Sequence, residues 1–336
     1  MRKNVLYVGN ALSNKGNTST TIETLGDRLG ENYNVKIASN KSNKICRLLD
    51  MVFLVLRYQS KTDYVLIDTY STSNFYYAYI ISQLCRLFQL RYIPILHGGN
   101  LEQRLKNNPK LSGLIFNNAY KLVAPSNFLK TVFERYGYKD VLYISNTIDI
   151  DDYTYLRREI CTINMLWVRS FTSIYNPEQA VLVLEQLIAK NYKATLTMVG
   201  PDMDGSLIKV KRLAQAKYLD IVFTGKLSKT DWVARSEASN VFINTTNFDN
   251  TPVSVIEAMA LGLPIVSTNV GGLPYLICDK EDGLLVPPQD VDAMVNAIIK
   301  LKSDENLKNK LVAKARSKVE NYDWSEVKHK WEALLS

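Results

Sequence analysis

Apolar positions along the chain follow two alternating patterns. Short apolar runs are typical of buried strands, and the longer segments between them repeat apolar positions every three or four residues, as amphipathic helices do. Regular alternation of the two predicts an α/β fold, with parallel sheets covered by helices on both faces. Strands are expected over 5–8, 35–38, 64–67, 91–96, 121–124, 141–145, 165–168, 195–199, 221–223, 241–244, 264–267 and 283–286. Helices are expected over 20–29, 45–58, 75–88, 127–136, 177–190, 207–218, 231–236, 252–261, 291–300, 307–321 and 324–335.

The alternation breaks near residues 149–162, and the length of 336 residues also favours two domains. We expect a doubly wound, Rossmann-like N-terminal domain over 1–155, a second over 156–320, and a final helix over 321–336. Ligands of such sheets bind beyond the carboxyl ends of the strands. Loops at these ends, facing a central cleft, should therefore carry the chemistry.

The most informative stretch is a polar loop that leads from one expected strand into a helix. Thr251 is expected as the helix N-cap and Pro252 as the first helical residue. Unpaired N–H groups at such a helix start form a site for an anion. Asp249 in the loop and Glu257 on the helix can accept hydrogen bonds from hydroxyl groups. Phosphate affinity beside two acids predicts a ligand such as a nucleotide sugar.

This stretch resembles the Glu-x7-Glu signature of the retaining glycosyltransferases of family 4, among the glycosyl transferases group 1, which have the GT-B fold. Gly262-Leu263-Pro264 and Asn269-Val270-Gly271-Gly272 follow in the order of that family. The resemblance implies that Asp249 contacts the donor sugar, where the family usually has Glu, and that Glu257 binds the ribose hydroxyls. It also implies that the last helix crosses back onto the first domain. The donor-binding loop residues would be Asn250, Thr251, Pro252 and Val253. A capped helix with two surface acids is the alternative.

A loop of small residues after the first expected strand also leads into a helix start, which suits phosphate. It matches neither the G-x-G-x-x-G nor the Walker signature, so dinucleotide redox chemistry and ATP hydrolysis lose support. In the resembled family a glycine-containing loop here touches the donor phosphates. Gly16, Asn17 and Thr18 are therefore donor-binding candidates, although a simple connecting loop would look the same.

His97 follows the strand expected at 91–96 and precedes Gly98, Gly99 and Asn100. Glycines at a strand end let the backbone approach a ligand closely. The resemblance implies that His97 faces the donor sugar and the acceptor, with the next three residues on the acceptor side. The alternative is a purely structural histidine.

Arg169 directly follows an expected strand, where it could bind a diphosphate through two hydrogen bonds. Many relatives have a lysine six residues later, also on the phosphates, but that position here is Tyr175. Lys226 is the best substitute for the second cation. The expected catalytic residues are His97, Arg169, Asp249 and Glu257.

Composition bears on whether the chain holds a metal or a cofactor and on where in the cell it is found. Four scattered cysteines have no metal-ligand spacing and are expected to be reduced core residues. Only two histidines occur, which argues against a histidine-rich zinc site or a hydrolase built from several histidines. We expect no metal and no cofactor. No signal peptide and no apolar run of roughly 20 residues is evident, which predicts a cytoplasmic protein.

Positive charge is concentrated in the first half of the chain. Residues 1–150 hold 19 Lys and Arg against 10 Asp and Glu, whereas residues 151–336 hold 22 against 23. A basic face could favour nucleic acid, anionic lipid or a phosphorylated acceptor, or it could simply keep the protein soluble. Segment 41–61 is apolar in the middle and basic at both ends, so it is either a buried sheet-flanking helix or one that lies at a membrane surface.

We favour a retaining, metal-independent glycosyltransferase, a hexosyl- or N-acetylhexosaminyl-transferase of polysaccharide biosynthesis. It would move a sugar from a nucleotide-diphosphate sugar to a glycan or a polyprenyl-diphosphate-linked acceptor, with peripheral contact to an anionic membrane and none to nucleic acid. Two alternatives stay open. One is a nucleotide-sugar epimerase of the GT-B fold, and the other is a non-catalytic relative that only binds a sugar nucleotide.

Overall fold

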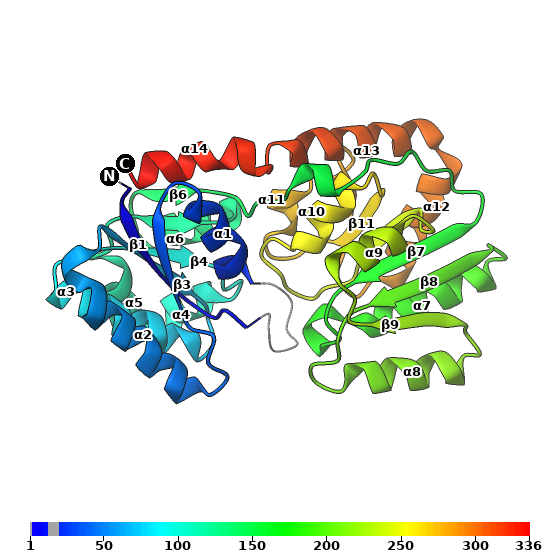
Figure 1. Cartoon of the computed structure of the whole chain (residues 1–336). Coiled ribbons are helices and arrows are strands. Elements are labelled where there is room, and N and C mark those ends of the chain that lie inside the picture. The colour runs from blue at the N-terminus through cyan, green and yellow to red at the C-terminus, as the bar shows by residue number, and fades with distance from the viewer. Residues whose placement is uncertain (1, 13–19) are drawn as a thin grey trace. The chain divides into compact units, whose positions relative to one another are not determined.

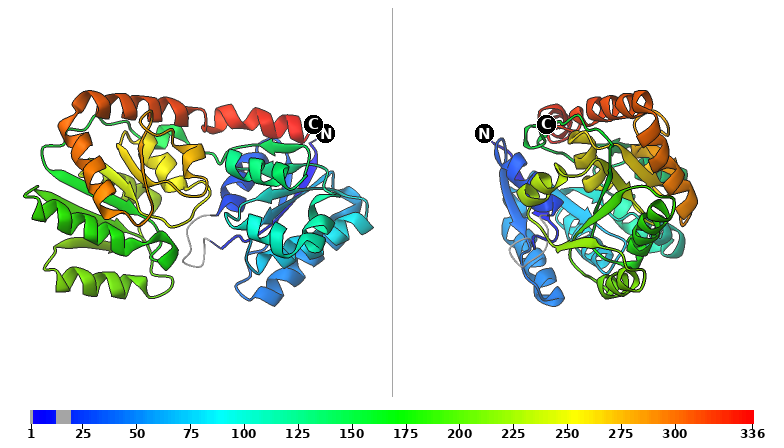
Figure 2. Two further views of the ribbon diagram at one scale, coloured as in Figure 1. Left: turned by 180° about the vertical axis from the view of Figure 1, so that it is seen from behind. Right: turned by 90° about the vertical axis from the view of Figure 1, so that its right-hand side faces the viewer.

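The computed structural model describes residues 2–12 and 20–336, which form two compact units. Unit 1 comprises Met1–Thr147 together with Lys328–Ser336, and unit 2 comprises Ile148–Val327. Each unit contains a six-stranded sheet with helices on both faces (Figures 1 and 2). The expected α/β class with two doubly wound sheets is confirmed.

The sheet of unit 1 has the order β2-β1-β3-β4-β5-β6, and all its neighbouring strands are parallel. Its central strand β3 is buried along its whole length, as expected for an apolar run covered on both faces. The strands are β1 (Asn4–Val8), β2 (Asn34–Ala38), β3 (Tyr64–Thr69), β4 (Arg91–Leu96), β5 (Leu122–Ala124) and β6 (Val141–Tyr143). The helices are α1 (Thr21–Gly30), α2 (Lys44–Tyr58), η2 (Gln59–Lys61), α3 (Asn74–Leu87), α4 (Leu101–Asn107), α5 (Pro109–Phe116) and α6 (Asn127–Arg135).

The sheet of unit 2 is also fully parallel, in the order β12-β11-β10-β7-β8-β9. Its strands are β7 (Ile163–Val168), β8 (Ala194–Val199), β9 (Ile221–Gly225), β10 (Val241–Asn244), β11 (Ile265–Thr268) and β12 (Leu284–Val286). Its helical segments are η3 (Ile150–Asp152), η4 (Ser173–Tyr175), α7 (Pro177–Ala189), α8 (Ser206–Ala216), α9 (Lys229–Ser236), α10 (Val253–Ala260), α11 (Leu273–Leu276), α12 (Val291–Ser303) and α13 (Glu305–Glu320). Each face of the sheet packs its own hydrophobic core.

The structure differs from the expectations in several places, including the short helix α11, which was not expected. Helices α4 and α5 were not expected, because Asn107 and Asn108 interrupt the apolar periodicity and Pro109 starts the second helix. The cysteines are free, but only Cys85 is buried. The other three are exposed, which corrects the expectation of core residues: Cys46, Cys161 and Cys278.

The last helix, α14 (Trp324–Leu334), begins in unit 2, and its residues from Lys328 onward belong to unit 1. Within unit 1, Asn32 donates a hydrogen bond to Glu332 Oε1 at 3.0 Å. The expected return of the final helix to the first domain is confirmed. No described helix is both long enough and apolar enough to cross a bilayer.

Trp331 should stabilise unit 1, because its indole on α14 is only 3% exposed. Trp331→Ala is expected to lower the free energy of unfolding by about 3–5 kcal/mol, since it leaves a cavity. Glu326→Gln, at an exposed position of the same helix, should change it by less than about 0.5 kcal/mol. Urea unfolding followed by circular dichroism measures both, and equal midpoints for the two variants would contradict the assignment.

Candidate functional site

Helix α10 begins one residue later than expected. Pro252 is the N-cap, with an extended backbone (φ −68°, ψ 117°), and Val253 is the first helical residue. The N–H groups of Val253 and Ser254 donate to no residue that the structure describes. The side-chain oxygens of Thr251 and Ser254 also lack hydrogen-bond partners within the described part of the chain. Unpaired donors therefore gather at this helix start, as an anion site requires.

Two glycines hold the loop before α10 close to its neighbour. Gly272 donates its N–H to the carbonyl oxygen of Asp249 at 2.9 Å. Gly271 has a positive φ of 54°, and a Cβ atom at this position would collide with the same carbonyl oxygen. The Gly-Gly pair that follows β11 therefore serves a steric purpose: it lets the two loops touch.

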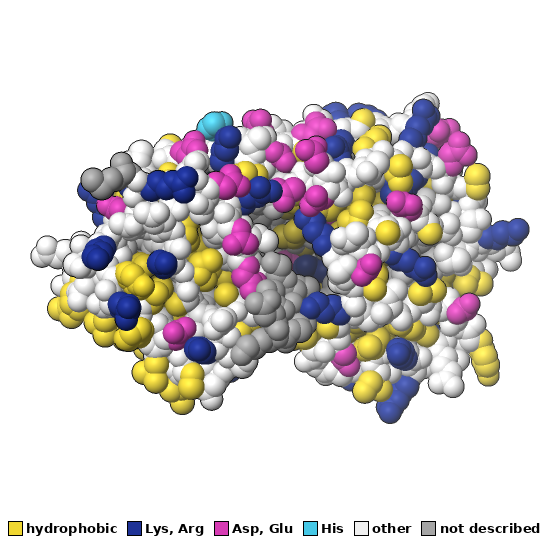
Figure 3. Space-filling model, viewed as in Figure 1, with side chains coloured by type: hydrophobic (Ala, Val, Ile, Leu, Met, Phe, Trp, Pro, Cys, Tyr) yellow, Lys and Arg dark blue, Asp and Glu magenta, His cyan; other side chains and the backbone are white. Residues whose placement is uncertain are grey.

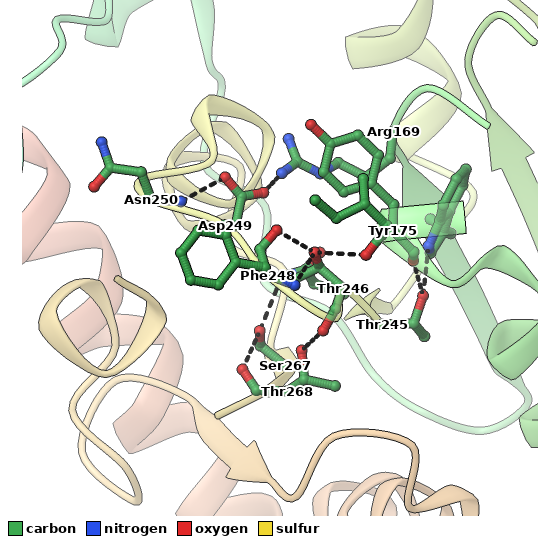
Figure 4. Close-up of polar contacts among 12 residues, drawn as sticks. Arg169, Tyr175, Thr245, Thr246, Phe248, Asp249, Asn250, Ser267 and Thr268 are labelled. Atoms are coloured by element: carbon green, nitrogen blue, oxygen red, sulfur yellow. Dashed lines mark hydrogen bonds and ion pairs between the residues drawn. The ribbon is translucent and has the colours of Figure 1, made fainter. Parts of the chain in front are cut away.

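A hydroxyl network underlies the same loop (Figure 4). Thr246 Oγ1 accepts a hydrogen bond from the N–H of Phe248 at 3.2 Å. Thr268 Oγ1, at the end of β11, donates to the carbonyl of Thr246 at 2.6 Å. Thr245 Oγ1 accepts from the indole N–H of Trp167 at 3.0 Å. These bonds fix the loop to β7 and β11, so Asp249 and Asn250 occupy a defined place.

Arg169 forms an ion pair with Asp249 (Figure 4). Both side chains are 14% exposed. Tyr175 lies against the guanidinium, with its ring centroid 4.2 Å from Arg169 Cζ. Burial lowers the pKa of the Arg169 guanidinium, and the nearby Tyr175 opposes that shift. Gly200 leaves room for Arg169, because a Cβ there would collide with the Arg169 carbonyl oxygen.

Glu257 is held by a residue that the sequence patterns did not reveal. The Tyr153 hydroxyl donates to Glu257 Oε1 at 2.6 Å. Burial raises the pKa of the Glu257 carboxyl, while the bond from Tyr153 and the charge of Lys229 lower it. Lys229 Nζ lies 4.9 Å from the ring centroid of Tyr153. No spacing rule links Tyr153 to Glu257, so only the fold could reveal this contact.

Lys226 is exposed and follows β9 at the edge of the sheet, two strands away from β7, which Arg169 follows. The aromatic ring of Tyr175, rather than a second cation, is the group packed on the Arg169 guanidinium. The role of Lys226 stays a prediction.

In unit 1, His97 follows β4 and pairs through Nε2 with Asp68 Oδ1 at 2.8 Å. Asp68 was not among the predicted site residues, although an acid that ends an otherwise apolar strand is a readable signal. The N–H of Gly98 donates to the Thr69 carbonyl at 3.2 Å, and a Cβ at Gly98 would collide with the N–H of Ser71. The last two acceptor-side candidates, Gly99 and Asn100, lie between this contact and α4.

The other donor-binding candidates, Gly16, Asn17 and Thr18, lie outside the described residues. Within residues 2–12 and 20–336, no cluster of three or more His, Cys, Asp or Glu side chains could hold a metal ion.

A model of a protein family matches the part of the chain that contains the site of unit 2. Residues 163–318 match the family model described as glycosyl transferases group 1. Over this segment the chain is similar to the glycosyl transferases group 1. The segment contains Arg169, Asp249 and Glu257, so three of the expected catalytic residues lie inside the family region.

Curated proteins match short stretches of the chain. A probable sucrose-phosphate synthase 2 of Craterostigma plantagineum is 37% identical over 91 residues, which are 27% of this chain and 8% of that protein. The UDP-Gal:alpha-D-GlcNAc-diphosphoundecaprenol alpha-1,3-galactosyltransferase of Escherichia coli is 29% identical over 85 residues, or 25% of this chain and 22% of that protein. The chain thus spans less than a quarter of the length of either relative.

Solved structures resemble the chain over nearly its full length. Sucrose-phosphate synthase from Thermosynechococcus elongatus superposes with a TM-score of 0.83 and 18% identity, covering 99% of this chain and 98% of that one. Anabaena Alr3699/HepE in complex with UDP and glucose gives a TM-score of 0.77 and 16% identity, covering 99% of both chains. Similarity at this identity concerns the fold, and the expected GT-B fold is confirmed.

The loop that holds Asp249 lies against Gly271 and Gly272, so a larger residue at Gly271 should lower the stability of the protein. Gly271→Ala should lower the free energy of unfolding by about 1–3 kcal/mol, because its positive φ and the nearby Asp249 carbonyl both oppose a Cβ. Gly30→Ala is the matched control, since Gly30 lies in α1 with nothing within 4 Å of the added carbon. That control should leave stability unchanged or raise it by up to about 1 kcal/mol. Urea unfolding of both variants measures the difference, and a Gly271→Ala variant as stable as the control would refute the argument.

Proposed function

We propose that the chain is a retaining, metal-independent glycosyltransferase that uses a nucleotide-diphosphate sugar. The observation that carries this proposal is the convergence of Arg169 with the unpaired donors at the start of α10, bracketed by Asp249 and Glu257. Cationic and N–H donors suit a diphosphate, whereas carboxylates suit sugar and ribose hydroxyls. The match of residues 163–318 to the model of the glycosyl transferases group 1 also supports a glycosyltransferase.

The residues would act on the leaving group. The bond between the sugar and the diphosphate breaks, and the diphosphate gains negative charge in the transition state. Arg169 and the N–H groups at the start of α10 would stabilise that charge as preorganised donors. The diphosphate would replace Asp249 as the partner of Arg169, which frees the carboxylate for a hydroxyl of the donor sugar.

Retention follows from the route of attack that we propose. The acceptor hydroxyl forms its new bond to the sugar on the face that the diphosphate leaves, and the departing phosphate takes the hydroxyl proton. Glu257, fixed by Tyr153, would hold the ribose end of the nucleotide. Holding the donor at both ends would limit the positions open to the reacting carbon, which favours reaction over diffusion apart.

The acceptor that we propose is a glycan or a polyprenyl-diphosphate-linked sugar. The E. coli relative is named for a diphosphoundecaprenol-linked substrate, and a Staphylococcus aureus relative for capsular polysaccharide biosynthesis. The surface of α2 supports a lipid-linked acceptor. Met51 and Val55 pack the helix against the sheet, while an apolar stripe on the same helix stays exposed. The stripe comprises Ile45, Leu49, Phe53 and Leu56.

Figure 3 shows hydrophobic side chains gathered over α2 at the lower left of the molecule. Four exposed basic residues lie on and beside the same helix: Lys41, Lys44, Arg57 and Lys61. An apolar stripe with basic ends is suited to the surface of an anionic bilayer. We therefore propose peripheral contact between α2 and such a membrane.

Substitution of Arg169 tests the catalytic assignment. A donor is first identified by thermal-shift measurements with UDP-, GDP-, ADP- and dTDP-sugars, since a bound ligand raises the melting temperature. Arg169→Gln should then lower transfer to a polyprenyl-diphosphate-linked sugar by about a hundredfold or more, because a preorganised donor is lost. Arg235→Gln, which removes an exposed positive charge from α9, should leave transfer unchanged.

Further outcomes separate this proposal from its alternatives. Full activity of Arg169→Gln, or activity abolished by a chelator and restored by divalent ions, would overturn the mechanism. Conversion of the donor without any acceptor would identify an epimerase. Donor binding without turnover would identify a non-catalytic relative. The anomeric configuration of the product, measured by NMR coupling constants, decides between retention and inversion.

Vesicle binding tests the role of α2. Vesicles of equal parts phosphatidylcholine and phosphatidylglycerol should bind the protein, and Leu49→Gln with Phe53→Gln should weaken binding by about tenfold or more, since two apolar contacts are lost. Leu87→Gln removes an exposed apolar residue from α3 of the same unit and is the matched control. Co-sedimentation measures all three proteins. Absence of binding, or equal binding by the α2 variant and the control, would exclude this surface.

A further inference from the structure

Three neighbouring strands of unit 1 bring polar groups together around Asp68. The carboxylate lies near the end of β3 and is only 4% exposed. Its Oδ1 atom accepts a hydrogen bond from the buried Tyr7 hydroxyl of β1 at 3.0 Å. The same oxygen lies 2.8 Å from Nε2 of His97, which follows β4. One buried oxygen thus has polar neighbours on both sides, within the sheet order β1-β3-β4.

The second oxygen, Oδ2, has no hydrogen-bond partner within residues 2–12 and 20–336. A cavity of about 10 Å³ adjoins it, and its lining includes Asp68, Tyr70 and Gly9. Gly9 is required here, because a Cβ at that position would collide with Oδ2. A space of this size has room for about one water molecule. A buried carboxylate with one unpaired oxygen is costly, so its presence calls for an explanation beyond core packing.

The imidazole of His97 is fixed on a second side. The Tyr70 ring stacks on it, with ring centroids 5.3 Å apart and an angle of 27° between the planes. The backbone N–H of His97 donates to the Thr69 carbonyl at 3.0 Å, which fixes the main chain beside the ring. The histidine side chain is 6% exposed, and its Nδ1 atom makes no hydrogen bond to any part of the chain that the structure describes. Among the described residues, Nδ1 is therefore the ring nitrogen left without a partner.

We propose that Asp68 is a positioning residue that selects the tautomer of His97. The carboxylate has no proton to donate when ionised, so it accepts from Nε2–H and leaves Nδ1 as the acceptor nitrogen. Nδ1 then accepts a hydrogen bond from a hydroxyl group of the donor sugar or the acceptor. The last step rests on the proposed glycosyltransferase function, whereas the choice of tautomer does not.

Tyr7 completes the arrangement. Burial raises the pKa of the Tyr7 phenol well above its usual value, and the negative charge of Asp68 raises it further. The phenol is therefore a permanent donor to Asp68 Oδ1 and cannot take the proton of Nε2. Any ionised carboxylate beside Nε2 would favour this tautomer, so the tautomer tests the selection itself, and the effect on transfer separates a positioning role from a merely structural one.

The first experiment reads the tautomer directly and needs no activity. The chain has only two histidines, so protein labelled with ¹⁵N-histidine gives two imidazole spin systems, and His329→Gln assigns them. The neutral ring of His97 should carry its proton on Nε2, with Nδ1 unprotonated. A ring protonated on Nδ1, or an even mixture of both forms, would overturn the proposal. His329 is exposed, and its Nδ1 lies 3.3 Å from Glu332 Oε2, so its ring provides a comparison in which the carboxylate faces the other nitrogen.

The second experiment measures the effect on transfer. Asp68→Asn keeps the shape of the side chain and removes its charge, and it should lower kcat by roughly 10- to 100-fold with little change in the KM of the donor, as misplacement of a site group does. The double variant Asp68→Asn/His97→Ala should be no slower than His97→Ala alone, because Asp68 acts through His97. Additive losses would overturn the proposal.

Two controls keep the results separable. If Asp68→Asn fails to fold, Tyr7→Phe removes the other bond to Oδ1 but keeps the carboxylate, so the ring of His97 should stay protonated on Nε2. Loss of that tautomer would overturn the assignment of its selection to Asp68. If no donor is turned over, the proposed function fails and the tautomer measurement still decides the role of Asp68.

Discussion

The parallel arrangement of the strands is the constraint on which both sites depend. In a parallel sheet all carboxyl ends meet at one edge, so residues far apart in sequence become neighbours there. His97 and Asp68 follow or end adjacent strands of unit 1, and Arg169 and the loop of Asp249 follow β7 and β10, which are adjacent in unit 2. The hydrophobic cores on each face of the sheets hold this register. The order of the strands thus determines which of these residues become neighbours.

Much of the fold could be predicted from the sequence, because buried strands and amphipathic helices leave different periodicities. Every expected strand exists in the structure, with ends displaced by a few residues at most. Helices α4 and α5 escaped prediction, since each is short and the two are separated by a single residue, Asn108. The start of α10 was misplaced by one residue because proline fits both the N-cap and the first helical turn.

The site was predictable only where a residue carries its own signal. Asp249, Glu257 and Arg169 stand in recognisable positions after strands or in a helix, so the sequence offers them as candidates, and their roles stay predictions. The residues that contact them could not be identified from the sequence. Tyr153 reaches Glu257 across 104 positions of sequence, and the ion pair of Arg169 with Asp249 joins two loops. Such contacts depend on side-chain directions that only the packed fold determines.

The division of α14 between the units bears on how the protein is made. Unit 1 is discontinuous: its sheet is complete by residue 143, yet Lys328–Ser336 also belong to it. Tyr64 in β3 donates a hydrogen bond to the carbonyl of Ser336 at 2.9 Å, so even the central sheet contacts these residues. During translation, unit 1 cannot form its last contacts until all of unit 2 has left the ribosome. The order of synthesis therefore differs from the order in which the two units can be finished.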